Sequence, residues 1–166
     1  MEINLSGRRA LITGGSRGLG RAMAESFAGA GADVAVIARD TEALEDTRVA
    51  LHEARSSGKY LAISADVSDV NEINRAHEEV TAFFGPVDIL VNNAATNPYA
   101  GPMIDADLPR WEKTIYVNMT APFLWTQMVW QKYQKDNGGV ILNIASVGGL
   151  ETNPMLGVYD VTKAGL

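Results

Sequence analysis

A glycine-dense stretch near the amino terminus constrains the fold of this chain more than any other feature. It covers Thr13 to Gly20 and follows the apolar residues 10–12, which we interpret as the end of a buried strand. Downstream, Leu19, Met23 and Phe27 are spaced four apart, which predicts a helix with one apolar face. A strand, a glycine turn and a helix in this order form a cradle for phosphate. Glycine lets the backbone approach a ligand closely, and the helix start offers unpaired N–H groups.

The spacing of the glycines indicates which kind of nucleotide fold to expect. Gly14, Gly18 and Gly20 leave gaps of three residues and of one residue. This differs from the common Gly-x-Gly-x-x-Gly pattern of dinucleotide-binding turns. The spacing therefore points to one branch of the dinucleotide folds.

Composition limits the domain organisation and the classes of partner. A chain of 166 residues, 46% hydrophobic, is long enough for one core and short for two. The formal net charge of −6 argues against nucleic acid as a partner. No apolar run approaches the ~18 residues that a membrane span needs, so we expect no membrane partner. The absence of cysteine excludes thiolate metal sites and agrees with a cytoplasmic location.

Apolar runs alternate with amphipathic segments along the chain, which predicts an α/β fold. The run at 33–38 is almost continuously apolar, as expected for a parallel strand covered on both faces. We predict a doubly wound parallel sheet with strands at 8–13, 33–38, 60–64, 87–91 and 140–144. Helices are expected at 18–30, 40–57, 68–84 and 109–135, and around Tyr159.

Apolar spacing within these helices predicts their buried positions. We expect Val70 to face the core in one helix, and Phe123 and Trp130 in the long helix. Pro122 is expected to bend that long helix, because proline removes a backbone hydrogen bond to residue 118. His77 shares an apolar stripe, so we interpret it as a core residue. No metal site is expected.

Two arginines suggest which dinucleotide would bind. A preference for NAD requires an acidic residue about 20 residues after the glycine turn, and that position is occupied by Ala38, followed by Arg39. Arg39 and Arg17 could grip a 2′-phosphate through charge-assisted hydrogen bonds. We therefore predict NADP(H). The alternative is that Arg39 lies in solvent and Asp40 caps the next helix.

A tyrosine and a lysine near the end of the chain suggest acid/base chemistry. Tyr159 and Lys163 lie one turn apart on the same face if the segment is helical. An ammonium beside a phenol stabilises the phenolate, as a general acid/base requires. Ser146 follows the fifth predicted strand and would lie at the same edge of the sheet.

Taken together, these motifs resemble the short-chain dehydrogenase/reductase family. The resemblance implies a Rossmann-type sheet with helices on both faces. It covers essentially all 166 residues and rests on matches in order and approximate spacing, at the turn 13–20, Asp66-Val67, Asn92-Asn93-Ala94, Asn118, Ser146, Tyr159 and Lys163.

The resemblance implies roles for individual residues. Tyr159 would exchange a proton with the substrate oxygen, and Ser146 would hydrogen-bond that oxygen. Lys163 would promote ionisation of the tyrosine and hold the nicotinamide ribose, while Asn118 would order a water linked to the lysine. Asn92 would face the cofactor side of the crevice. The implied cofactor-binding residues are Gly14, Ser16, Arg17, Gly18, Leu19, Gly20, Arg39, Asp66, Val67, Asn93, Ala94, Ala95, Tyr159 and Lys163.

The chain departs from the family pattern in two places. Ala95 stands where many members have glycine. The sequence also stops at Leu166, whereas members continue through two further strands. We expect residues 1–166 to form one dinucleotide-binding domain, truncated after the fifth strand and without the carboxyl-terminal part of the family domain.

The predicted activity is hydride transfer between NADP(H) and a small-molecule carbonyl or alcohol, as in carbonyl reductases. Substrate contacts are expected from 96–103 and 147–156. Family members commonly associate through two long helices, so a homodimer or homotetramer is expected. Two alternatives remain: a non-catalytic NADP-binding protein, and a chain that pairs with a partner through its fifth strand.

Overall fold

Five parallel strands form a single sheet within residues 3–166, the part of the chain described by this computed structural model. All five predicted strands are confirmed, with bounds that differ by no more than two residues. They are β1 (Arg9–Thr13), β2 (Asp33–Ala38), β3 (Tyr60–Ser64), β4 (Ile89–Asn92) and β5 (Val140–Asn143). The spatial order is β3-β2-β1-β4-β5, so the direction of winding reverses between β1 and β4. A crevice opens at the carboxyl ends of strands at such a reversal.

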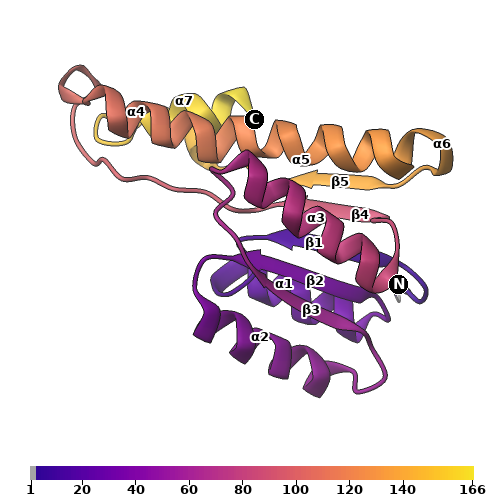
Figure 1. Cartoon of the computed structure of the whole chain (residues 1–166). Coiled ribbons are helices and arrows are strands. Elements are labelled where there is room, and N and C mark those ends of the chain that lie inside the picture. Colours follow the sequence, from indigo (N-terminus) through magenta and orange to yellow (C-terminus); the bar gives the residue numbers. More distant parts are fainter. Residues whose placement is uncertain (1–2) are drawn as a thin grey trace.

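Helices cover both faces of this sheet (Figure 1). One face carries α1 (Gly18–Gly29) and α2 (Thr41–Ala54), and the other carries α3 (Val70–Phe84) and a long helical segment. That segment comprises α4 (Leu108–Ile115), a π turn (Tyr116–Thr120), α5 (Ala121–Val129), a second π turn (Trp130–Gln134) and α6 (Lys135–Asn137). The last helix, α7 (Gly157–Gly165), packs against α4 and the first π turn. The doubly wound α/β fold is thereby confirmed. Every helix in the described part of the chain falls short of the length and hydrophobicity needed for a bilayer span.

Two apolar cores lie on opposite faces of the sheet. Leu11 and Ile37 pack with Trp125 on the side of α3 and α5, whereas Ile12 and Val36 pack on the side of α1 and α2. Neighbouring residues of a strand point to opposite faces, so a central strand buried on both sides must be apolar at every position. This explains the continuous apolar run that marked β2.

Three of the predicted core positions are wrong. Val70, Phe123 and Trp130 are 44%, 60% and 51% exposed. In α5 the residues that face the sheet are Trp125 and Val129, one turn apart, so Phe123 and Trp130 fall off the buried stripe. Val70 is the first residue of α3, before the buried face of that helix begins. Apolar spacing alone did not show which of several apolar stripes meets the sheet.

Pro122 is accommodated by a π turn. It is the second residue of α5, and the turn Tyr116–Thr120 comes directly before that helix. The Ala121 N–H donates to the Tyr116 carbonyl, five residues back, which widens the helix where proline cannot donate. Asn118 lies at the centre of this widened turn. In Figure 1 the segment from α4 to α6 continues in one general direction.

His77 is buried on α3, as predicted from its apolar stripe. Burial lowers the pKa of His77, and the charge of Lys132 lowers it further. The imidazole is therefore neutral near pH 7, as expected for a packed core residue.

An ion pair fastens the amino ends of β1 and β4. Asp88 is buried, and its Oδ2 accepts from both the backbone N and the Nε of Arg9, at 3.0 and 2.7 Å. Arg8 Nη1 lies 3.5 Å from Oδ1. Burial by itself raises the pKa of Asp88, but the hydrogen bonds from Arg9 outweigh it, so the pKa lies below its ordinary value. The ionised carboxylate therefore stabilises the fold.

Substituting Asp88→Asn should weaken the acid dependence of stability. A carboxyl whose pKa is depressed on folding contributes stability above its unfolded pKa of about 3.9, and loses it as the pH falls through the folded value. Urea unfolding from pH 7 to pH 2 should show a smaller free energy of unfolding for the variant at pH 7. The difference from the wild type should shrink below about pH 4. A difference that stays constant with pH would contradict this assignment.

Candidate functional site

A cavity of about 490 Å³ opens at the carboxyl ends of the strands, beside the winding reversal between β1 and β4. Its volume lies in the range of small-molecule sites, roughly 300–1,000 Å³. Twelve of the predicted cofactor-binding residues line it: Gly14, Ser16, Arg17, Gly18, Leu19, Gly20, Arg39, Asp66, Val67, Asn93, Ala94 and Ala95. Thr96, expected among the substrate contacts, also lines it, whereas sequence analysis did not assign the remaining lining residues to the site: Ile37, Ala38, Asp40, Ala65, Lys113 and Val117.

The glycine turn lines one end of the cavity, and its backbone packs so closely there that a residue larger than glycine would clash at Gly14 and Gly20. Gly14 has a φ of +65°, and a Cβ there would lie 2.9 Å from the Cα of Ala94. A Cβ on Gly20 would overlap the Gly14 carbonyl oxygen and lie 2.5 Å from Asn93 Nδ2. The first turn of α1 therefore folds back against the end of β1. No side chain caps the amino end of α1, which leaves its first N–H groups free to bind an anion.

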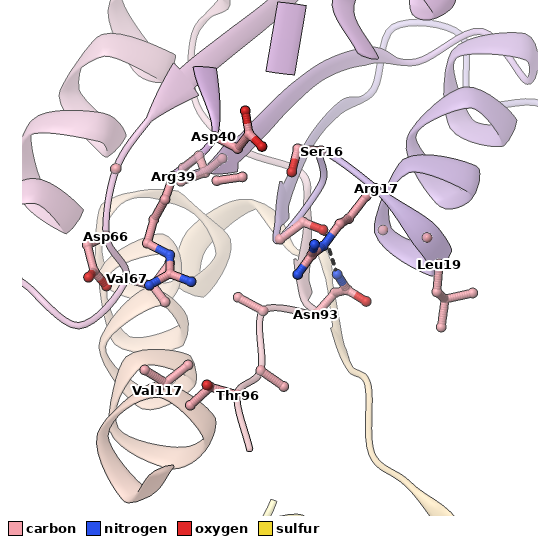
Figure 2. A pocket seen from close by; sticks show the side chains of 18 of the residues that line it. Ser16, Arg17, Leu19, Arg39, Asp40, Asp66, Val67, Asn93, Thr96 and Val117 are labelled. Atoms are coloured by element: carbon pink, nitrogen blue, oxygen red, sulfur yellow. Dashed lines mark hydrogen bonds between the residues drawn. The ribbon is translucent and has the colours of Figure 1, made fainter. Parts of the chain in front are cut away.

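Thr13 and Asn93 tie the turn to the end of β4. Asn93 Nδ2 donates to the carbonyl oxygens of Thr13 and Gly14, each at 3.0 Å. Thr13 Oγ1 accepts from the backbone N of Asn93 and of Ala94, each at 3.1 Å. The bond from Asn93 to Gly14 is the dashed line in Figure 2. These bonds fix the spacing between the two strand ends that form the crevice.

Asn92 and Asn93 have different environments. Asn92 is buried and lies outside the cavity lining, which corrects the expectation that it faces the cofactor side. Its Nδ2 donates to Asn143 Oδ1 at 2.9 Å and to Thr126 Oγ1 at 3.2 Å, so it joins β4 to β5 and α5. The alternation of side chains along β4 explains this, because adjacent residues point to opposite sides of the sheet.

Two arginines approach the cavity from different elements. Arg17 precedes α1 and Arg39 follows β2, and both side chains project toward the same hollow in Figure 2. Neither forms a salt bridge within residues 3–166. Asp40 Oδ1 accepts from Ala43 N at 3.1 Å and caps α2, as the alternative interpretation expected. Arg39 is exposed, as that alternative also expected, and it lines the open cavity at the same time.

The end of the cavity beyond Arg39 contains a polar cluster. Asp66 Oδ1 accepts from Ser68 N at 2.8 Å and from Ser68 Oγ at 2.6 Å. Lys113 Nζ reaches from α4 to Ser68 Oγ at 2.5 Å and to Asp66 Oδ2 at 3.4 Å. Burial by itself raises the pKa of Asp66, but the hydrogen bonds from Ser68 and the charge of Lys113 outweigh it and hold the pKa low.

Asn118 connects the cavity wall to α7. Its Oδ1 accepts from Thr96 N at 2.8 Å, and its Nδ2 donates to Thr96 O at 2.9 Å and to Thr162 Oγ1 at 3.0 Å. Thr96 lines the cavity, and Thr162 belongs to α7. A single buried amide in the π turn therefore holds both segments.

The predicted tyrosine and lysine share one face of α7. Lys163 Nζ lies 5.8 Å from the centroid of the Tyr159 ring and donates to the Ile144 carbonyl oxygen at 2.6 Å. Burial lowers the pKa of Lys163. Ser146 Oγ accepts from Gly148 N at 3.1 Å, just after β5. Tyr159 and Lys163 lie outside the lining of the large cavity, although both were expected to bind cofactor.

A second cavity, of about 360 Å³, lies on the other face of α7. Met103 and residues 148–154 of the predicted substrate loops line it, together with Asp160 and Val161 of α7. Tyr159 is not among the residues that line this second cavity. Asp160 Oδ2 accepts from Asn153 N at 2.8 Å, which anchors this loop to the helix. Nowhere in residues 3–166 do three or more His, Cys, Asp or Glu side chains gather as a metal site would require.

Comparison with known proteins decides the family. The family model described as short chain dehydrogenase matches residues 8–166. The chain belongs to the short-chain dehydrogenase family. Members of this family are oxidoreductases that bind nicotinamide cofactors, which agrees with the resemblance drawn from the motifs and with the parallel sheet.

Two relatives illustrate the similarity of this short-chain dehydrogenase to known members. It is 40% identical over 145 residues to the short chain dehydrogenase/reductase dpmpG of Macrophomina phaseolina, covering 86% of this chain and 82% of that protein. It is 31% identical to L-sorbose reductase from Gluconobacter frateurii, solved with NADPH and L-sorbose, with a TM-score of 0.94. That match covers all of this chain and 62% of the reductase. Against seven further curated relatives, the chain spans 37–62% of their length.

The comparisons leave both nicotinamide cofactors open for this short-chain dehydrogenase. The sorbose reductase structure contains NADPH, whereas a xylitol dehydrogenase was solved with NAD⁺ bound. That dehydrogenase is 26% identical, with a TM-score of 0.90, and the match covers 96% of this chain and 61% of the dehydrogenase. Similarity alone therefore does not choose between the cofactors.

Substituting Gly20→Ala should destabilise the protein by about 1–3 kcal/mol, because the new Cβ would overlap the Gly14 carbonyl and displace Asn93. Gly29→Ala, at the other end of α1, is the matched control. A Cβ there meets nothing within 4 Å, so we expect no loss and a gain of up to about 1 kcal/mol. Urea unfolding measures both variants. Equal effects of the two substitutions would contradict the close packing of the turn.

Proposed function

We propose that this short-chain dehydrogenase transfers hydride between NADP(H) and a small carbonyl or alcohol substrate. The observation that carries the proposal is the pair of arginines, Arg17 and Arg39, that line the cavity beside the glycine turn. The residue that ends β2 is Ala38, where an acidic side chain would favour the ribose hydroxyl of NAD. When bound, the nicotinamide ring supplies or accepts the hydride.

The glycine turn fits the phosphates of such a cofactor. The positive φ values of Gly14 and Gly18 and the tight packing of Gly20 bring the backbone to the cavity without side chains in the way. The uncapped amino end of α1 favours the negative charge of a pyrophosphate.

The arginines fit an additional phosphate on the adenosine ribose. Because neither makes a salt bridge in the part of the chain that is described, both guanidinium groups keep their donors for a ligand. A guanidinium matches phosphate oxygens in a two-bond fork, which gives affinity and orientation together. The carboxylate of Asp40, the anion next to Arg39, already caps α2.

Tyr159 is the proposed proton donor and acceptor. Lys163 lies against its ring and is held by the Ile144 carbonyl, so a positive charge stands beside the phenol. This charge favours the phenolate that a general base requires, and the proton returns to the substrate oxygen in the reverse direction. Ser146 is the proposed hydrogen-bond partner of that oxygen. Asn118 is proposed to maintain the site, because it holds α7 at Thr162.

The whole protein is proposed to be a cytoplasmic homodimer or homotetramer. Supporting this, the long helical segment exposes Phe123 and Trp130, large apolar side chains of the kind that interfaces cover.

Substituting Arg39→Ala should weaken NADPH binding by about 10- to 100-fold, because one charge-assisted hydrogen-bonding group is lost. NADH affinity should change by less than about twofold, since NADH has no 2′-phosphate. Fluorescence titration with both cofactors measures the effect. The control is Arg48→Ala on α2, whose guanidinium pairs with Glu45 outside the cavity. Equal losses for both cofactors, or tighter NADH binding by the wild type, would refute the NADP(H) assignment.

Substituting Tyr159→Phe should lower turnover by about 10²–10⁴-fold and leave NADPH affinity within about twofold, because only the proton-transfer group is removed. Turnover is followed at 340 nm with a panel of ketones, aldehydes and sugars. Tyr133→Phe is the control, since Tyr133 contacts Arg9 at the opposite edge of the sheet. A variant as active as the wild type would favour a non-catalytic nucleotide-binding protein instead.

A further inference from the structure

We propose that Lys113 determines the base selectivity of the cavity by fixing the Asp66 carboxylate so that one acceptor position faces the base. The inference rests on the proposed function, because it takes the occupant to be an adenine dinucleotide. Lys113 was not among the predicted site residues, and it acts through Asp66 as a positioning residue.

The residues that line the end of the cavity beyond Arg39 have the chemistry that a purine site requires. Val67 and Val117 provide apolar surface for the faces of a planar ring, and Asp66 provides an acceptor. In Figure 2, Asp66 and Val67 lie on the side of Arg39 away from Ser16 and the glycine turn. A dinucleotide with its phosphates at the turn therefore directs its base here.

The hydrogen bonds of Asp66 leave one free acceptor position. Each carboxylate oxygen has two lone pairs. Ser68 N and Ser68 Oγ occupy both lone pairs of Oδ1, and Lys113 Nζ takes one of Oδ2. The one position left can accept a single hydrogen bond from a ligand.

Lys113 and Ser68 close the cluster and prevent the carboxylate from turning. Ser68 Oγ donates to Asp66 and accepts from Lys113 at 2.5 Å, so the three side chains form a ring of contacts. Lys113 belongs to α4, whereas Asp66 and Ser68 belong to the loop after β3. Without the lysine, this loop loses its hydrogen bonds to Lys113 of α4.

The charge state of Asp66 sets which base is accepted. Its pKa lies below the ordinary value, so it is ionised and acts only as an acceptor at neutral pH. The 6-amino group of adenine can donate to it. The 6-oxo group of hypoxanthine accepts and cannot donate. It would place a second acceptor against the Asp66 carboxylate and leave the free position on that carboxylate without a donor, which costs affinity.

The test compares NADPH with its analogue nicotinamide hypoxanthine dinucleotide phosphate by fluorescence titration. The wild type should bind NADPH at least about 10-fold more tightly than the analogue. Lys113→Met should reduce this ratio to within about threefold, whereas Lys113→Arg should retain most of it. Lys135→Met on α6 is the control for loss of one positive charge, and should leave the ratio unchanged. Ser68→Ala should also lower the ratio, because it opens the ring of contacts without changing the charge.

The outcomes separate this inference from the proposed function. If Lys113→Met lowers the affinity for both ligands equally, or if the wild type binds both with equal affinity, Lys113 does not set base selectivity. The proposal that the protein binds NADPH would be unaffected by either result. If the wild type binds neither ligand, the proposed function fails, and this inference fails with it. Thermal unfolding of each variant shows whether the fold is retained, and Ser68→Ala provides the same test if Lys113→Met unfolds.

Discussion

The structure depends on a close approach of backbone to backbone where β1 ends. Gly14 lies against Ala94, and Gly20 lies against Gly14, so the backbones at the start of α1, the end of β1 and the end of β4 come close together. Asn93 supplies the polar link in this region, because it donates to two carbonyl groups of the turn. The crevice and the orientation of α1 both follow from this contact. The ion pair of Asp88 with Arg9 lies at the opposite ends of the same strands, where it adds stability without entering the crevice.

Features encoded by neighbouring residues could be predicted from the sequence. The strands are short apolar runs between turn residues, and the glycine turn is a local pattern, so the order and type of the main elements follow from periodicity. Burial could be predicted less well. Phe123 and Trp130 are apolar and helical, yet Trp125 and Val129 face the sheet. Choosing between these stripes requires knowledge of how the long helix lies on the sheet, which local spacing does not contain.

The residues of the candidate site that belong to sequence motifs could be predicted. The glycine turn, Asp66-Val67 and Asn93-Ala94 line one cavity because each follows a parallel strand, and parallel strands end at one edge. Lys113 could not be found in this way, since it lies within a helix and not after a strand, and its partner is 47 residues away. The expectation that Asn92 faces the cofactor side of the crevice is wrong, because a pair of adjacent asparagines gives no sign of which one lines the crevice. The π turn at Asn118 could not be predicted either: Pro122 indicated that the regular hydrogen bonding of the helix is interrupted there, but not that the helix widens instead of bending.

Asn118 connects the wall of the large cavity to helix α7 through its side-chain amide. Its amide holds both backbone groups of Thr96 in the cavity wall, and the same amide holds Thr162 on the helix that carries Tyr159 and Lys163. A shift of α7 must therefore break the bond to Asn118 or carry the wall with it. One side chain in the π turn therefore links the cavity wall to the helix that carries Tyr159 and Lys163, so a substitution at Asn118 removes hydrogen bonds on both sides at once.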